Sequence, residues 1–251
     1  MAEHRFHTPE PAELAITVPS GEIEVETIDG DESTIELEGD EKLIELTEVR
    51  QEGRRLIVEA KGKKFGLTIS IGDFSFGPSG LRVRARIPHR SRAELSTASA
   101  DMAVRGRIET LEVKSASGDL VVRGEIERDA IIKTVSGDVR LDHVGAELRV
   151  QTVSGDVSAG SVGGSVVSKT VSGDVRLDNV RQGNVNAQSV SGDVEVGVAP
   201  GTNLDVDAGS VSGDLTSEVP LGSDPSSDGD GPLLVVRGKT VSGDFRVFRA
   251  A

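Results

Sequence analysis

The sequence contains no cysteine, tryptophan or tyrosine, and only six of its 251 residues are phenylalanine. Without cysteine, the chain can form neither a disulfide framework nor a thiolate metal site, and it fits a reducing compartment. With so few aromatic rings, the core must be built from valine, leucine, isoleucine and alanine. The phenylalanines avoid the centre of the chain, which indicates a narrow interior there; they are Phe6, Phe65, Phe74, Phe76, Phe245 and Phe248.

Long apolar runs are absent as well. No segment approaches the roughly 18 apolar residues of a membrane-spanning helix, and the first six residues, MAEHRF, lack the apolar stretch of a signal peptide. We therefore expect a soluble, cytoplasmic protein. The net charge of −14 disfavours nucleic acid as a partner, because the phosphate backbone attracts basic proteins.

Glycine is abundant, at 30 residues, and many of these glycines belong to a repeated tripeptide. Around each Ser-Gly-Asp, apolar or small residues recur at alternate positions, which is the period of a β-strand with one buried face. The tripeptide interrupts this alternation and is expected to be a turn. A degenerate copy, Ser99-Ala100-Asp101, lies 18 residues before the first. The repeat serines are Ser117, Ser136, Ser154, Ser172, Ser191, Ser212 and Ser242.

A repeat of this length cannot bury its apolar side alone, so the copies must stack. The prediction is an all-β fold, a right-handed parallel β-solenoid with about 18–19 residues per coil, the hand following the general rule for parallel crossovers. Each strand then pairs with its copy one coil away, about 4.8 Å along the axis. We expect a β-rich N-terminal capping region at residues 1–92, continuous with the solenoid at residues 93–251.

Two segments depart from the repeat. Residues 218–232 are polar and acidic and predict a mobile surface loop, after which Val241–Phe248 is expected to be the strand that closes the stack. In the capping region, alternation and turn residues predict strands at Glu13–Pro19, Glu22–Ile28, Thr34–Leu37, Leu43–Thr47, Arg55–Ala60, Leu67–Ile71 and Leu81–Ile87.

With the repeat established, the chain resembles the bacterial "putative adhesin" family of β-solenoid domains of unknown function. The resemblance rests on Phe6-His7-Thr8-Pro9-Glu10-Pro11, on Val18-Pro19-Ser20-Gly21-Glu22-Ile23-Glu24-Val25, and on T-V-S-G-D-V copies such as Thr134–Val139 and Thr170–Val175. It extends over essentially the whole chain. It implies the solenoid fold and an adhesin-like role by name only.

The aspartates of the repeat form the most regular candidate site. Stacked carboxylates could bind Ca²⁺, which takes several oxygen ligands, but the glycine-rich nonapeptide calcium repeat is absent and only one aspartate per coil is aligned. We interpret the column as a structural turn ladder, in which each carboxylate accepts a hydrogen bond from a nearby backbone N–H. Its members are Asp119, Asp138, Asp156, Asp174, Asp193, Asp214 and Asp244.

The sequence predicts no catalytic, cofactor or metal site. A polysaccharide-cleaving solenoid would need an acid and a base carboxylate facing a cleft, and no unique pair stands out. No Ser-His-Asp arrangement or phosphate-binding glycine loop is recognisable. His4 and His7 lack a third ligand for a metal, and the remaining histidines, His89 and His143, are scattered.

Charge is distributed unevenly along the chain. Residues 1–60 carry 17 acidic and 5 basic side chains, whereas residues 61–107 carry 3 acidic and 10 basic. One predicted strand has a glutamate stripe at positions 22, 24 and 26, and another has an arginine stripe at positions 82, 84 and 86. We expect the two strands to be neighbours, because opposite charges across strands contribute roughly 0.2–1 kcal/mol per pair. The alternative is an anion-binding surface of Arg82, Arg84, Arg86, Arg90 and Arg92.

These features favour a non-enzymatic scaffold or binding module that uses its ladder faces as a repetitive surface, with an unknown protein or glycan as its partner. Two alternatives stay open. One is a solenoid that self-assembles end to end into a homo-oligomer, and the other is a polysaccharide-active enzyme, although fold alone licenses no activity.

Overall fold

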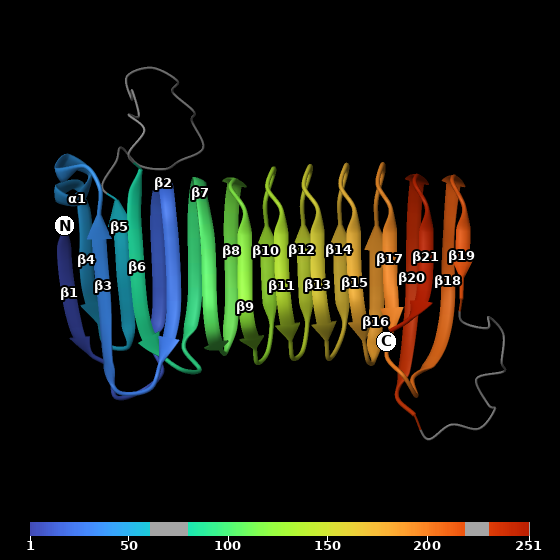
Figure 1. Cartoon of the computed structure of the whole chain (residues 1–251), viewed down its shortest axis with the longest axis horizontal. Helices are drawn as coiled ribbons and strands as arrows, with labels where there is room; N and C mark the ends of the chain where they lie inside the picture. Colours follow the sequence, from blue (N-terminus) through green and yellow to red (C-terminus); the bar gives the residue numbers. More distant parts are fainter. Residues whose placement is uncertain (61–79, 219–230, 251) are drawn as a thin grey trace, which may run out of the picture.

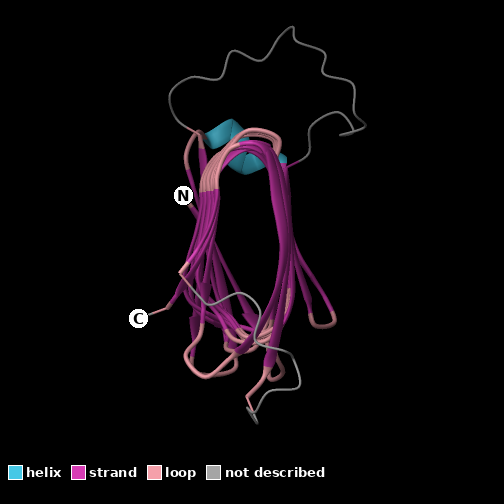
Figure 2. Ribbon diagram, turned by 90° about the vertical axis from the view of Figure 1, so that its right-hand side faces the viewer, coloured by secondary structure: helices cyan, strands magenta, loops and turns pink. Residues whose placement is uncertain are grey.

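The computed structural model describes residues 1–60, 80–218 and 231–250. These residues form a flattened tube of stacked β-coils, in which two sheets face each other along the whole length (Figures 1 and 2). The fold is thus the predicted all-β parallel solenoid. Its elements are β1 (Ala2–His7), β2 (Glu13–Ile28), β3 (Glu32–Glu38), α1 (Glu41–Leu46), β4 (Thr47–Glu52), β5 (Arg55–Ala60), β6 (Leu81–Pro88), β7 (Arg92–Ile108), β8 (Thr110–Ser117), β9 (Leu120–Ile126), β10 (Ala130–Lys133), β11 (Val139–Val144), β12 (Leu148–Gln151), β13 (Val157–Val162), β14 (Val166–Lys169), β15 (Val175–Val180), β16 (Gly183–Gln188), β17 (Val194–Val198), β18 (Asn203–Ser212), β19 (Leu215–Ser217), β20 (Leu233–Ser242) and β21 (Phe245–Arg249).

Each regular coil consists of two strands joined by a Ser-Gly-Asp corner. The strand before the corner pairs in parallel with the same strand of the next coil, so that Ala130 lies opposite Leu148 and Leu148 opposite Val166. The strand after the corner does likewise, with Val139 opposite Val157 and Val157 opposite Val175. The corners consequently follow one another along one edge of the tube, the upper edge in Figure 1.

The interior of the tube is filled by columns of valine, leucine, isoleucine and alanine, as the composition predicts. The exceptions are Met102 and Phe245, and the ring of Phe245 is fully buried inside a coil rather than at an end. Gly238 makes room for it, because a Cβ at Gly238 would lie only 2.0 Å from a ring carbon of Phe245. A narrow interior therefore accepts one large ring where the facing position has no side chain.

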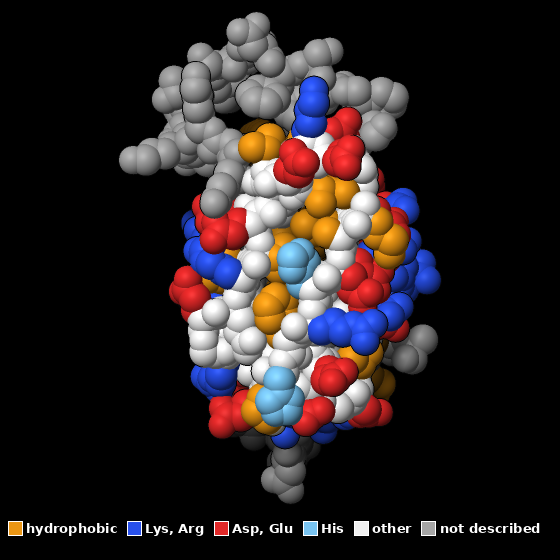
Figure 3. Space-filling model, turned by 90° about the vertical axis from the view of Figure 1, so that its left-hand side faces the viewer, with side chains coloured by type: hydrophobic (Ala, Val, Ile, Leu, Met, Phe, Trp, Pro, Cys, Tyr) orange, Lys and Arg blue, Asp and Glu red, His pale blue; other side chains and the backbone are white. Residues whose placement is uncertain are grey.

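The N-terminal coils do not follow chain order. β2 pairs in parallel with β7 on one side and with β5 and β6 on the other, so parallel coils extend into the region predicted as a cap. Beyond them, β1, β3 and β4 pair antiparallel with their neighbours and form this end. Figure 3 shows apolar, acidic and basic side chains interspersed over the end.

One predicted strand in this region is wrong. Residues 43–46 of the predicted strand Leu43–Thr47 lie in the helix α1, and Thr47 begins β4. The helix forms because the side chain of Asp40 accepts a hydrogen bond from the backbone N–H of Lys42 at 2.8 Å and caps its first turn. The predicted strand Leu67–Ile71 lies outside the described residues.

The C-terminal coils are also out of chain order, and the prediction that Val241–Phe248 closes the stack is wrong. The last coil in sequence, β20–β21, lies between β16–β17 and the outermost coil, β18–β19. The inner coil is the more apolar of the two, since Leu234, Val236 and Phe245 are completely buried whereas Leu215 of the outer coil is 45% exposed. Most of the loop predicted at 218–232 lies outside the described residues.

Candidate binding face

One of the two sheets carries a row of amines and amides on its outer surface. It is formed by the strands that precede the corners, and the row occupies the position three residues before each repeat serine, where the strand alternation points outward. Four of the eight lysines of the chain lie in this row. In spatial order the row is Ser96, Lys114, Lys133, Gln151, Lys169, Gln188 and Lys239.

A valine ridge runs beside this row, one residue before each serine. The valine side chains are between 46% and 52% exposed, although valine is normally buried. They are exposed because the strand period places them outside while the corner begins at the next residue. The ridge consists of Val135, Val153, Val171, Val190 and Val241.

A third row lies five residues before each serine, on the other side of the lysine row. It consists of Ile131, Arg149, Val167, Asn186 and Arg237, in register on β10, β12, β14, β16 and β20. We call the fifteen residues of these three rows on these five strands the lysine–valine face. Five of them are cationic and none carries a carboxylate, although the protein has a net charge of −14.

Most cations of the lysine–valine face form no ion pair with a described residue, although Asp207 of β18 is the register partner of Arg237. Arg149 pairs with Glu147 at 2.8 Å, just beyond the face. Within the part of the chain that the structure describes, Lys133, Lys169, Lys239 and Arg237 form no ion pair. The lysines of this face therefore carry positive charge that no ion pair within the described residues neutralises.

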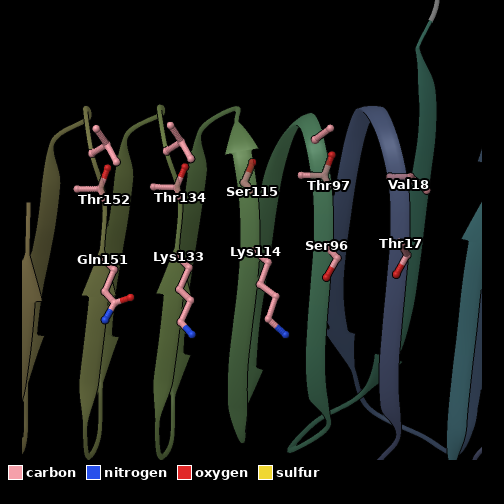
Figure 4. Close-up of a pocket in the computed structure, with 13 residues that line it drawn as sticks. Thr17, Val18, Ser96, Thr97, Lys114, Ser115, Lys133, Thr134, Gln151 and Thr152 are labelled. Atoms are coloured by element: carbon pink, nitrogen blue, oxygen red, sulfur yellow. The ribbon is translucent and has the colours of Figure 1, made fainter. Parts of the chain in front are cut away.

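A groove of about 590 Å³ leads into the face from the N-terminal side (Figure 4). Lys114 and Lys133 line one side of it, valines of the ridge line the other, and Thr97 and Thr134 lie between them. Lys114 lines the groove but, unlike Lys133, it forms an ion pair, because it contacts Glu112 at 2.8 Å. The hydrogen bond to Glu112 raises the pKa of Lys114.

The outer surface of the opposite sheet differs in its charge balance. Arg140 lies 2.9 Å from Asp138, and Arg176 lies 2.6 Å from Asp178. Arg246 contacts both Glu218 and Glu195. These three arginines are matched by carboxylates, whereas Arg105 and Arg123 on the same side form no ion pair within the described residues. The two sheets still differ, because only the sheet before the corners combines its cations with a valine ridge.

The aspartate column runs along the corner edge as a continuous hydrogen-bonded ladder. Oδ1 of Asp156 accepts the backbone N–H of Asp174 at 2.9 Å, and Oδ1 of Asp174 accepts that of Asp193 at 2.8 Å. The donor lies one coil away rather than in the same turn. Among the described residues, no group of three or more histidines, aspartates or glutamates is placed to hold a metal ion. The ladder runs through Asp101, Asp119, Asp138, Asp156, Asp174, Asp193, Asp244 and Asp214.

The predicted pairing of the glutamate and arginine stripes is confirmed. β2 and β6 are parallel neighbours, and Glu22–Arg82, Glu24–Arg84 and Glu26–Arg86 lie 2.7, 3.1 and 3.4 Å apart. The hydrogen bond from Arg82 lowers the pKa of Glu22. The remaining members of the predicted anion-binding set are paired as well: Arg90 with Glu127 at 3.0 Å and Arg92 with Glu109 at 2.7 Å. The arginine stripe is therefore not the uncompensated cationic surface of this protein.

Sequence reasoning missed the lysine–valine face because it aligned the repeat on its inward columns and its turn. The signal was present in the outward positions, where lysine precedes Thr-Val-Ser at 133–136, 169–172 and 239–242. The histidines stay scattered, as predicted: His89 lies 3.4 Å from Asp29 and His143 lies 3.8 Å from Glu125. In the described residues, no helix has the length and apolarity needed to span a bilayer.

Comparisons with known proteins bear on the fold and the family. The sequence model of the Toastrack DUF4097 family matches residues 12–248. Two solved structures, a "putative adhesin" from Bacteroides fragilis and another from Parabacteroides distasonis, are similar to this chain with TM-scores of 0.56 and 0.59 and identities of 12% and 14%. In both cases the similarity covers 98% of this chain and 96% of the other. No curated protein matches the sequence.

Proposed function

The chain belongs to the Toastrack DUF4097 family, and we propose that it is a non-enzymatic binding module whose lysine–valine face docks an extended anionic partner. The observation that carries the proposal is the composition of that face, which has five cations and no carboxylate in fifteen residues of an acidic protein. Because net charge repels anions from the rest of the surface, the face is the favoured place for one to bind.

The spacing of the lysines supports an extended partner. Lys133, Lys169 and Lys239 stand on every second coil, with Gln151 and Gln188 between them, so successive amines are separated by about 10 Å along the axis. A single exposed ion pair is worth only about 0–1 kcal/mol. Several amines held in line by a rigid sheet can act together on a partner that spans them.

The surroundings of the best carboxylate cluster support a non-enzymatic role. A polar hollow at the first corner contains Glu22, Glu38, Asp101 and Arg82. Arg82 contacts both glutamates, at 2.7 and 3.7 Å, and the carboxylate of Asp101 accepts the backbone N–H of Asp119. A glutamate whose pKa is lowered by an arginine is a poor general acid, since that role needs a raised pKa.

The proposal is tested by chromatography on a sulfonate cation exchanger at pH 7. At about 0.1 M salt the Debye length of about 10 Å lets the resin sense one face rather than the net charge. We expect the wild-type protein to be retarded and the variant Lys133→Glu/Lys169→Glu/Lys239→Glu to flow through.

The matched control is Lys42→Glu/Arg105→Glu/Arg123→Glu, which changes the net charge by the same six units at exposed positions outside the face. It should be retarded like the wild type. Passage of the wild type without retardation, or equal behaviour of the two triple variants, would show that the face has no special affinity for anions.

Self-association is a second candidate, favoured by the difference between the two ends. Among the described strands, β18 and β19 pair on one side only, with β20 and β21, and Val211 at this end is 82% exposed. Of the described strands at the other end, β1 and β4 also pair on one side only, but they run antiparallel to their neighbours β3 and β5. Because the two ends differ in strand direction, we expect two copies to join through like ends rather than to stack head to tail into a filament. Light scattering after size exclusion, over a concentration range, should show at most a dimer; continued growth would contradict this geometry.

A further inference from the structure

We infer that the partner of the lysine–valine face is the surface of an anionic lipid bilayer. The inference rests on the proposed function and specifies its ligand. It is drawn from three properties of the face: the apolar rows on both sides of the lysines, the flatness of the sheet, and the absence of aromatic side chains.

The apolar rows indicate an amphipathic partner. Seven of the fifteen residues are valine or isoleucine, five in the exposed ridge and two, Ile131 and Val167, in the opposite row. A soluble polyanion would use the amines alone and would leave these side chains in water. At a bilayer surface, head-group charges lie directly above the acyl region, so amines and apolar side chains of one flat surface can both be satisfied. Lysine suits such a place, because its apolar stem can lie along apolar surface while the amine stays with the charges.

The shape of the face indicates a planar partner. Five strands at the sheet spacing extend about 19 Å along the axis, and the three rows extend about 13 Å across it. The end-on view shows the two sheets as long, gently curved walls (Figure 2). A linear chain could follow one row, whereas a membrane surface can contact all three rows at once.

The composition of the face disfavours the other anionic partners. Bases of single-stranded nucleic acids bind by stacking on aromatic side chains, and none of the fifteen residues is aromatic. The chain has no tryptophan or tyrosine with which to stack a sugar ring. What the face offers is charge and aliphatic surface.

Co-sedimentation of the full chain with vesicles tests the inference. We expect binding to phosphatidylcholine vesicles that contain phosphatidylserine, and at least about tenfold weaker binding to pure phosphatidylcholine. One basic residue at an anionic surface is worth about a fivefold change in affinity, so the variant Lys133→Glu/Lys169→Glu/Lys239→Glu should lose more than tenfold. The control Lys42→Glu/Arg105→Glu/Arg123→Glu should bind like the wild type.

The valine ridge separates this inference from the proposed function. The variant Val153→Thr/Val171→Thr/Val190→Thr keeps the charge and the β-branched shape of each side chain. It should bind anionic vesicles at least about fourfold more weakly, which is the change in affinity expected from the loss of one buried methylene. Its retention on the sulfonate resin should stay unchanged.

Each of the remaining outcomes overturns either the inference or the proposed function. Retention on the resin without binding to vesicles, or binding of dextran sulfate in preference to vesicles, overturns the bilayer and leaves the anion-binding face intact. Vesicle binding that the threonine variant retains in full overturns the role of the apolar rows. Failure on both resin and vesicles overturns the inference and the proposed function together.

Discussion

The glycine of each corner satisfies two constraints at once. Gly155 has a φ of +153°, in a region that side-chain-bearing residues rarely adopt. A Cβ on it would also lie 2.3 Å from the carbonyl oxygen of Gly137 in the preceding coil. The Ser-Gly-Asp sequence predicts the first constraint, because it predicts a turn. The second depends on how closely the coils stack, which no single repeat reveals.

Replacing Gly155 should therefore be costly. Gly155→Val forces a side chain against the backbone of the preceding coil, and we expect it to lower the free energy of unfolding by about 3 kcal/mol or more, as strain and overpacking together do. Ser158→Val, on the outer surface of β13 in the same coil, should change it by less than about 0.5 kcal/mol. Urea unfolding followed by circular dichroism measures both, and similar losses would argue against the stacked corner.

The aspartate ladder makes a distinct prediction at the same corner. Asp156→Ala removes the acceptor of the Asp174 N–H and should cost about 1 kcal/mol, the usual net value of a hydrogen bond. Asp156→Asn keeps an acceptor oxygen and should cost less. Addition of Ca²⁺ or EDTA should leave the melting temperature unchanged for the wild type. A calcium-dependent rise that Asp156→Asn abolishes would show that the column binds the ion.

At the scale of elements, the contact between β2 and β6 makes stability depend on pH. The pKa of Glu22 is lowered in the folded protein by its hydrogen bond to Arg82. Its contribution is therefore present above the unfolded pKa of about 4.3 and is lost as the pH falls through the lower folded value. Since the side chain is 39% exposed, we expect well under about 1 kcal/mol.

Urea midpoints between pH 3 and 7 should then converge for the wild type and Glu22→Gln at the acid end and separate above about pH 4.3. Glu41→Gln, on the exposed face of α1, serves as the control and should follow the wild type throughout. A constant difference between the wild type and Glu22→Gln at all pH values would exclude the ion pair as its cause.

The strands and their inward faces were predictable, whereas the order of the coils was not. Alternation located β5, β6 and the repeat strands, and opposed charge stripes correctly placed β2 beside β6. The repeats are nearly interchangeable in pattern, however, so position in the chain was taken for position in the stack. Burial decides instead: Leu234 and Phe245 of the last coil displace the less apolar coil of Leu215 to the end.

Engineered disulfides can test this coil order, because the chain has no native cysteine. Thr216 and Arg246 are register partners on adjacent strands, and a pair of cysteines there has the Cα spacing of about 5 Å that a disulfide needs. Thr216→Cys/Arg246→Cys should oxidise readily. The two cysteines of Thr216→Cys/Glu195→Cys would lie on adjacent strands only if the coils were stacked in chain order. In this structure their Cα atoms are about 10 Å apart, so this pair should stay reduced. The opposite pattern of oxidation would show that the last two coils are stacked in the reverse order.

At the scale of the whole molecule, the solenoid has two unlike sheets and two unlike ends. The sheet before the corners presents unpaired lysines and a valine ridge, and the sheet after them pairs Arg140, Arg176 and Arg246 with carboxylates. A repeat sequence predicts that such rows exist, since equal positions must align. Whether a row is neutralised depends on neighbours from other coils, and only the assembled stack shows that the lysines of β10, β14 and β20 lie apart from carboxylates.

Single cysteine labels on the two sheets test the central claim most directly. Gln151 lies in the lysine row of the lysine–valine face, between Lys133 and Lys169, and Ser158 lies on the opposite outer surface of the same coil. Each is replaced by cysteine and labelled with an environment-sensitive fluorophore, and phosphatidylserine-containing vesicles are added. Emission from position 151 should rise and shift to the blue as the face meets the bilayer, while emission from position 158 stays constant. A response at 158 equal to or larger than that at 151 would contradict the assignment of the face.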